Sequence, residues 1–234
     1  MSNTTTYVLG ALALAMVVVV ILLVRSSRDE PLATRNDGYG SVRDAAVVSV
    51  LGADGVVLLG RPDAPKTIDA YEDPMCPACG QIEKAYGQEL AQKLDEGKLA
   101  VRYHYVNFLN KQSKSGDYST RAIAAFECVA AAGSGPAYAK FQHALFVTDQ
   151  PAEGGDKDLD NQQLADLAAS AGAPADAVQC VRSGAKVEAA KAHADTATAA
   201  LRQVNDGTVS TPSIFDGTNK VDLTNQNWVA EIAG

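Results

Sequence analysis

Residues 67–90 read TIDAYEDPMCPACGQIEKAYGQEL, and this stretch decides the fold. Residues 67–71 have the composition of a short strand. Ile82, Tyr86 and Leu90 follow at helical spacing, which predicts one apolar face of a helix. The two cysteines of the C-x-x-C motif therefore lie where a strand is followed by a helix.

Cys76 and Cys79 are the candidate catalytic residues. The first N–H groups of a helix have no partner within it, and they favour a negative group together with the helix dipole. A thiolate at this position has a lowered pKa, and the thiolate is the reactive form. The spacing predicts thiol–disulfide exchange in which Cys76 attacks and Cys79 resolves the mixed disulfide.

Two other uses of the motif are considered. A zinc site usually needs four ligands, but the chain has one C-x-x-C, and no H-x-x-x-H follows it. A purely structural disulfide is the other alternative, and the strand–motif–helix context disfavours it. No metal and no cofactor are expected, because exchange needs only the two sulfurs.

The length and charge of the chain indicate its domain number and exclude one class of partner. The chain has 234 residues, 47% hydrophobic and 21% charged, with a net charge of −8. This length suits one domain with an appendage. The acidic balance argues against nucleic acid as a partner, because phosphate binding needs a basic surface.

An uncharged run at residues 7–24 just reaches the length of a membrane-spanning helix. A cleaved signal peptide is the alternative, but the run lacks a basic flank before it and an A-x-A-like site after it. We predict an N-terminal anchor at residues 1–24, then a linker at 25–44. Arg25 and Arg28 weakly place the domain inside the cell by the positive-inside rule. The cysteine chemistry places it outside, and we give the chemistry more weight.

The rest of the chain predicts an α/β domain. Strands are expected at 47–51, 56–59, 67–71 and 99–108, with the motif helix ending near Gly97. Strand, helix and strand form a βαβ unit with a parallel pair. Alanine-rich helices are expected at 118–132, 136–146, 159–171, 174–183 and 185–204, followed by strands at 208–215 and 219–223 and a helix at 228–232. This order predicts a thioredoxin fold over 45–234, interrupted by an α-helical insertion at about 110–184.

A family resemblance becomes specific at this point. Three features carry it: the motif with Tyr71-Glu72-Asp73 before it, the helical insertion with its two cysteines, and Thr211-Pro212. With these features the chain is similar to the DsbA-like thiol:disulfide oxidoreductases, in particular the membrane-tethered branch found in actinobacteria. The resemblance covers residues 45–234. It implies that Pro212 is cis and faces the motif, so that the backbone of Thr211 can pair with an extended substrate chain.

The resemblance also assigns tuning residues. Pro77 and Ala78 would set the redox potential, and the strongest oxidants of the family carry histidine where Ala78 stands, which predicts a milder oxidant here. A buried acid six residues before the first cysteine usually moves protons in this fold, but that position is Ala70. Glu72 or Asp73 could substitute, the alternative being that both are solvated loop acids.

Cys128 and Cys180 lie in separate predicted helices of the insertion. They are either buried free thiols or a pair. The resemblance and an oxidising compartment favour a structural disulfide.

The predicted enzyme is a protein disulfide oxidoreductase in the cell membrane, single-pass, with its domain on the extracytoplasmic side. By family analogy its partners are unfolded or reduced exported proteins and a quinone-linked membrane reoxidase. Two alternatives stay open: an envelope disulfide reductase or isomerase, and a tethered binding module without turnover.

Overall fold

A computed structural model describes residues 32–234 of the chain. Its centre is a six-stranded sheet in the order β1-β2-β4-β3-β5-β6. The strands are β1 (Val48–Leu51), β2 (Val57–Gly60), β3 (Lys66–Glu72), β4 (Leu99–Tyr105), β5 (Ser213–Asp216) and β6 (Asn219–Lys220). β3 and β4 are parallel and all other neighbours are antiparallel, so the predicted βαβ unit is confirmed.

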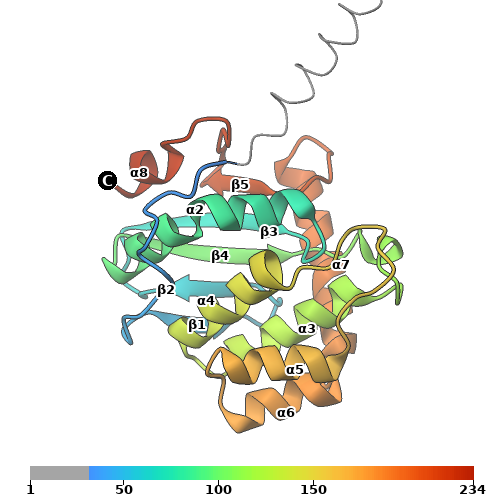
Figure 1. The fold of residues 1–234 in the computed structure, drawn as a ribbon. Coiled ribbons are helices and arrows are strands. Elements are labelled where there is room, and N and C mark those ends of the chain that lie inside the picture. The colour runs from blue at the N-terminus through green and yellow to red at the C-terminus, as the bar shows by residue number, and fades with distance from the viewer. Residues whose placement is uncertain (1–31) are drawn as a thin grey trace, which may run out of the picture. The chain divides into compact units, whose positions relative to one another are not determined.

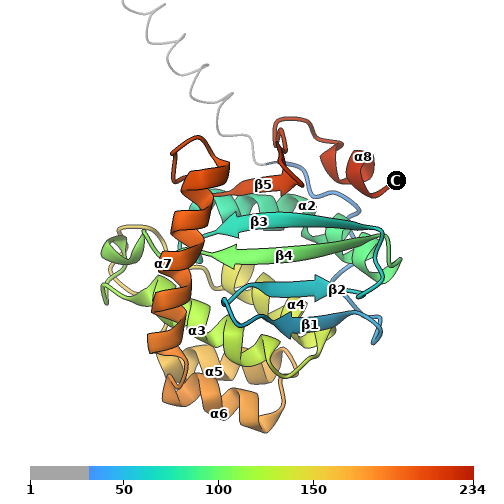
Figure 2. The ribbon, with the colours of Figure 1, turned by 180° about the vertical axis from the view of Figure 1, so that it is seen from behind.

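Helices cover both faces of this sheet. α2 (Pro77–Asp95) and α4 (Gly135–His143) lie on one face, and α7 (Val187–Val204) crosses the other near the ends of β3 and β4 (Figures 1 and 2). Side chains alternate along β3, so Ile68 and Ala70 join the main core while Tyr71 packs with Leu201 of α7. The thioredoxin-like mixed α/β fold is confirmed.

The helical insertion follows β4. It contains the short 3₁₀ helix η1 (Asn110–Gln112), α3 (Tyr118–Ala130), α4, the π-helical turn η2 (Ala144–Thr148), α5 (Asn161–Ser170) and α6 (Ala175–Ser183). Every residue of α3 except Arg121 is buried, which makes α3 the centre of the insertion. Its alanines suit this position because small side chains let neighbouring helices approach closely.

The chain N-terminal to the sheet differs from the prediction. The compact unit begins at Thr34, whereas we expected a linker through Asp44. Arg35 N–H donates to the Ala85 carbonyl at 2.7 Å, and the Tyr39 hydroxyl donates to Asp95 at 2.8 Å, so this segment lies along α2. Its polar composition resembles that of a free linker, but those polar groups are hydrogen-bonded to one helix.

The end of the chain has shorter strands than expected. β5 begins at Ser213 rather than 208, directly after Pro212, and its ladder with β3 begins at the Tyr71–Ser213 pair. Proline has no N–H to donate to a ladder, so the strand starts after it. The chain ends in α8 (Trp228–Ala233), whose Trp228 is buried.

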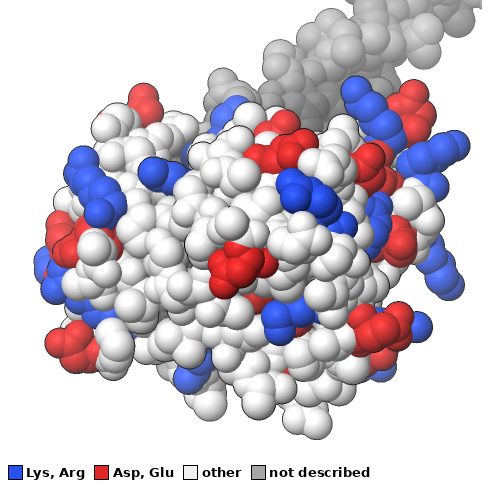
Figure 3. Space-filling model, turned by 90° about the horizontal axis from the view of Figure 1, so that it is seen from below, with Lys and Arg blue, Asp and Glu red and all other residues white. Residues whose placement is uncertain are grey.

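Charges are mixed on the face that carries α5 and α6. Lysine and arginine are interspersed with aspartate and glutamate there, and they form no basic patch on this face (Figure 3). Between residues 32 and 234, no helix combines the length and apolarity that a bilayer crossing requires. The predicted anchor at residues 7–24 lies outside the described residues.

The insertion contains a disulfide that joins Cys128 of α3 to Cys180 of α6 across 52 positions of sequence. In the chain-entropy account, a bond that closes a loop of this size stabilises the folded state by restricting the unfolded chain, by about 4 kcal/mol. We therefore expect the double variant Cys128→Ala/Cys180→Ala to lower the free energy of unfolding by about that amount in urea titrations. A difference below about 1 kcal/mol would contradict this role.

Candidate active site

The two motif cysteines lie in and just before the first turn of α2. Cys76 is the N-cap residue, Pro77 is the first helical residue, and Cys79 follows within that turn. Cys76 and Cys79 are buried with free thiols, whereas Pro77 and Ala78 between them are exposed. The four motif residues thus divide into a buried pair of sulfurs and an exposed bridge.

The Thr211–Pro212 peptide lies opposite the motif and is cis. The Cys76 thiol faces the Thr211 carbonyl at 3.4 Å, although the two residues are 135 positions apart. Thr211 comes before the first residue of β5, so its backbone lies outside the sheet ladder. The cis peptide that the resemblance implies is therefore present, and its Thr211 carbonyl is the group in contact with Cys76.

The two thiols differ in acidity. A hydrogen bond from the Cys79 thiol is the main cause that lowers the pKa of Cys76 to about 6, against the opposing effect of burial. The backbone N–H groups of Ala78 and Cys79 lower it further. Burial raises the pKa of Cys79 well above its usual value, and the hydrogen bond to Cys76 and the nearby Glu72 charge act in the same direction. At neutral pH the Cys76 sulfur is therefore mainly a thiolate, and Cys79 is a protonated thiol.

Asp73 is buried and fully hydrogen-bonded. Its Oδ1 accepts from the Ser119 hydroxyl at 2.6 Å and from Met75 N–H at 3.0 Å, and its Oδ2 accepts from Leu109 N–H at 3.0 Å. Burial raises the pKa of Asp73 to about 6 despite these bonds. The carboxyl thus joins the turn before Cys76 to the segment after β4 and to α3.

Glu72 is buried in a different environment. Its Oε2 has no hydrogen-bond partner among the described residues. Burial raises the pKa of Glu72 well above the usual range, and the charges of Glu83 and Cys76 raise it further. Burial of both acids excludes the alternative of solvated loop residues. Of the two acids, Glu72 makes fewer hydrogen bonds among the described residues, and its negative charge, when present, raises the pKa of Cys79.

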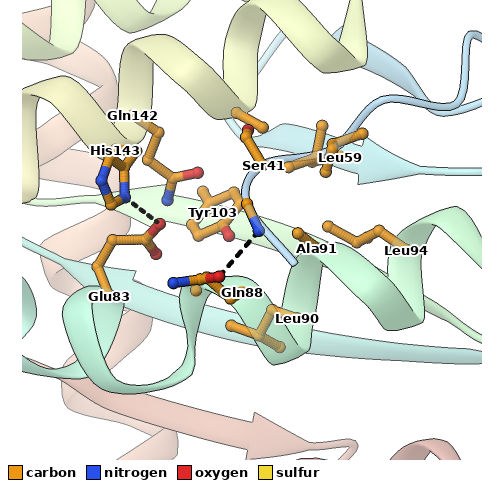
Figure 4. Close-up of a pocket in the computed structure, with 14 residues that line it drawn as sticks. Ser41, Leu59, Glu83, Gln88, Leu90, Ala91, Leu94, Tyr103, Gln142 and His143 are labelled. Carbon is orange, nitrogen blue, oxygen red and sulfur yellow. Dashed lines mark hydrogen bonds and ion pairs between the residues drawn. The ribbon is translucent and has the colours of Figure 1, made fainter. Parts of the chain in front are cut away.

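A cavity of about 130 Å³ lies between α2, α4 and the sheet (Figure 4). Glu83 and Gln142, which both act on the pKa of Glu72, line it. Glu83 also faces His143 at 3.9 Å across the gap between α2 and α4. The volume has room for a few water molecules, and Glu83, Gln142 and His143 offer them polar groups along a wall that is otherwise mainly apolar.

Some residues of this site have no signal in the sequence. Ser119, Gln142 and Gln150 come from the insertion, and polar residues in a helix or loop give no indication of a distant contact. Gly80 is the exception, because a glycine directly after the motif suggests that another segment approaches the helix closely.

The sequence profile of the family described as Thioredoxin matches residues 53–232. The chain belongs to this family. Its structure is similar to MdbA, a thiol-disulfide oxidoreductase from Corynebacterium matruchotii, with a TM-score of 0.71 and 29% identity over 81% of this chain and 93% of that one. DsbA from Mycobacterium tuberculosis gives a TM-score of 0.61 and 31% identity over 80% of this chain and 93% of that one.

A curated relative is much longer. The chain is 40% identical over 192 residues to the serine/threonine-protein kinase PknE of Mycobacterium tuberculosis, and the match covers 82% of this chain and 33% of that protein. This chain therefore spans about a third of the length of the curated relatives that it matches. The predicted resemblance to DsbA-like proteins is confirmed.

The shared hydrogen bond between the thiols leads to a test. Cys128 and Cys180 are bonded to each other, so the motif cysteines are the thiols that titrate. We expect absorbance at 240 nm to show a Cys76 pKa near 6 in the reduced protein, and a clear rise of that pKa in Cys79→Ala because the largest lowering cause is removed. An unchanged pKa in the variant would assign the effect to the helix N-terminus instead.

Proposed function

We propose that this protein introduces disulfide bonds into reduced, unfolded exported proteins by exchange at Cys76 and Cys79. The observation that carries the proposal is the position of Cys76 at the N-cap of α2, beside the cis Thr211–Pro212 peptide, where its pKa is lowered. A stable Cys76 thiolate stabilises the reduced enzyme, which makes the Cys76–Cys79 disulfide a stronger oxidant. A pKa of about 6 lies between the values typical of thioredoxin and of the strongest oxidants, so we infer a moderate oxidant.

The reaction begins with the oxidised enzyme. A substrate thiolate attacks Cys76 Sγ, the Cys76–Cys79 bond breaks, and a mixed disulfide forms while Cys79 leaves and takes up a proton. A second substrate thiolate then attacks the substrate sulfur of the mixed disulfide and releases Cys76 as a thiolate. Two electrons pass from the substrate to the enzyme, and the substrate gains one disulfide.

Substrate would bind beside the cis peptide. The backbone of Thr211 lies outside the β5 ladder and beside Cys76, so an extended chain that paired with it would bring a cysteine to the nucleophile. Pairing through backbone groups reads little side-chain identity, which suits an enzyme with many substrates. The exposed Pro77 and Ala78 would tune the potential, and Ala78 offers no imidazole to stabilise the thiolate further.

Glu72 is our candidate for proton transfer to and from Cys79. Its carboxyl is buried and has an oxygen without a hydrogen-bond partner in the part of the chain that the structure describes, and the nearby charges of Glu83 and Cys76 raise its pKa. A buried acid with a raised pKa is a stronger proton acceptor than a solvated glutamate, which makes it better suited to take a proton from a thiol. Asp73, with its three hydrogen bonds, would instead position the turn before Cys76.

The cellular setting is also a proposal. Residues 1–24 would anchor the chain in the cell membrane, and the domain would face the extracytoplasmic side, where the Cys128–Cys180 disulfide is stable. A quinone-linked membrane protein would reoxidise the enzyme. The anchor would keep both partners in one plane.

The reduction potential of the full chain, equilibrated in glutathione buffers, tests the direction of the reaction. We expect a value between those of thioredoxin and DsbA, roughly −120 to −220 mV, and loss of substrate oxidation in Cys76→Ser. A value near −270 mV, about that of thioredoxin, would instead favour an envelope reductase or isomerase. Retained biological activity in Cys76→Ser would favour a binding module without turnover.

Glu72→Gln tests proton transfer. We expect the resolution of a Cys76 mixed disulfide to slow by roughly tenfold to a hundredfold and to lose its dependence on a group titrating above the normal glutamate range. Rates from stopped-flow experiments across pH would show both effects. Glu89→Gln is the control, because Glu89 is also buried but lies about 15 Å from Cys79 along α2. Equal profiles for wild type and Glu72→Gln would exclude the proposed role.

A further inference from the structure

The segment that leads into α2 has few hydrogen-bond donors of its own. Pro74 and Pro77 have no N–H, and Cys76, the N-cap residue, makes no side-chain cap hydrogen bond. Pro74, Met75 and Cys76 are all buried, and buried carbonyls need hydrogen-bond partners. Another part of the chain supplies them.

Gln150 supplies both hydrogen bonds from one amide group. Its Nε2 donates to the Pro74 carbonyl at 3.1 Å and to the Cys76 carbonyl at 2.9 Å. Gln150 belongs to the loop after η2, so the contact joins the helical insertion to the nucleophile across 74 positions of sequence. Its two N–H groups match the two carbonyls on either side of Met75.

Gly80 makes room for this contact. A Cβ at position 80 would lie 2.4 Å from Gln150 Oε1 and 2.5 Å from the Phe146 carbonyl of η2. Only glycine lets η2 and the Gln150 side chain approach the first turn of α2 this closely. In Figure 1 the chain leaves α4 next to α2, which agrees with this approach.

The loop that carries Gln150 is itself fixed. Gly154 N–H donates to the Gln112 carbonyl at 2.8 Å, and the Arg121 guanidinium of α3 donates to Asp158 at 2.8 Å. Arg121 is the one residue of α3 that is not buried, and Asp158 is nearly covered. Gln150 therefore reaches the motif from a segment tied to η1 and α3.

We propose that Gln150 is a positioning residue that sets the reactivity of Cys76, an inference that rests on the proposed function. The Cys76 carbonyl accepts from Gln150 and from Gly80 N–H at 3.2 Å, so the amide fixes the orientation of the first helical turn. The Ala78 and Cys79 N–H groups that stabilise the Cys76 thiolate belong to that turn. Through Gln150, the insertion sets how well these donors face the sulfur.

Gln150→Met tests the proposal, because methionine keeps the length of the side chain and has no donor. We expect the Cys76 pKa to rise by about half to one unit and alkylation by iodoacetamide at pH 6 to slow roughly twofold to fivefold, since the thiolate fraction falls. Absorbance at 240 nm and alkylation rates measure these effects in the reduced full chain. Gln179→Leu, on the exposed side of α6, is the control and should match wild type.

The results separate a positioning role of Gln150 from a purely structural one. A Gln150→Met variant with a lower melting temperature but a wild-type Cys76 pKa and rate would overturn the proposal and leave a structural contact. If Gln150→Met does not fold, Gln150→Asn, which keeps the amide but shortens its reach, is judged by the same two results. An ordinary pKa and slow alkylation of Cys76 in wild type would instead overturn the proposed function, so the two failures are distinguishable.

Discussion

The site depends on the hydrogen bond that Cys79 donates to Cys76. It lowers the pKa of one sulfur and raises that of the other, so two identical side chains three residues apart take different chemical roles. Burial alone would raise both pKa values and leave two inert thiols. The start of α2, the cis peptide and the two buried acids surround this pair of unequal thiols.

The two adjacent acids show how context separates similar residues. Asp73 has three hydrogen bonds from three segments, so its carboxyl connects the turn before Cys76, the segment after β4 and α3. Glu72, one residue earlier, is also buried but has an oxygen without a hydrogen-bond partner among residues 32–234. The first arrangement fixes geometry, and the second leaves a group that can change its charge.

Much of the fold could be predicted because its signals are local. The β3–α2–β4 unit follows from strand composition, the motif and helical spacing within 40 residues, and the helices of the insertion follow from alanine-rich runs between Gly, Pro and Asp. The strand alternation also places Ala70 and Glu72 on one face, but it does not show which of Glu72 and Asp73 lacks partners. That difference depends on Ser119 and Leu109, which come from elsewhere in the chain. The contact of Gln150 could not be predicted for the same reason.

The segment from Thr34 to Asp44 looked like a free linker because polar residues and glycine are typical of both linkers and packed extended chain. Its hydrogen bonds to Ala85, Gln88 and Asp95 instead spread it along α2. Mechanical load on the chain before Thr34 would therefore enter this domain through the helix that carries the cysteines, and would shear its contacts with α2 before it reached the sheet.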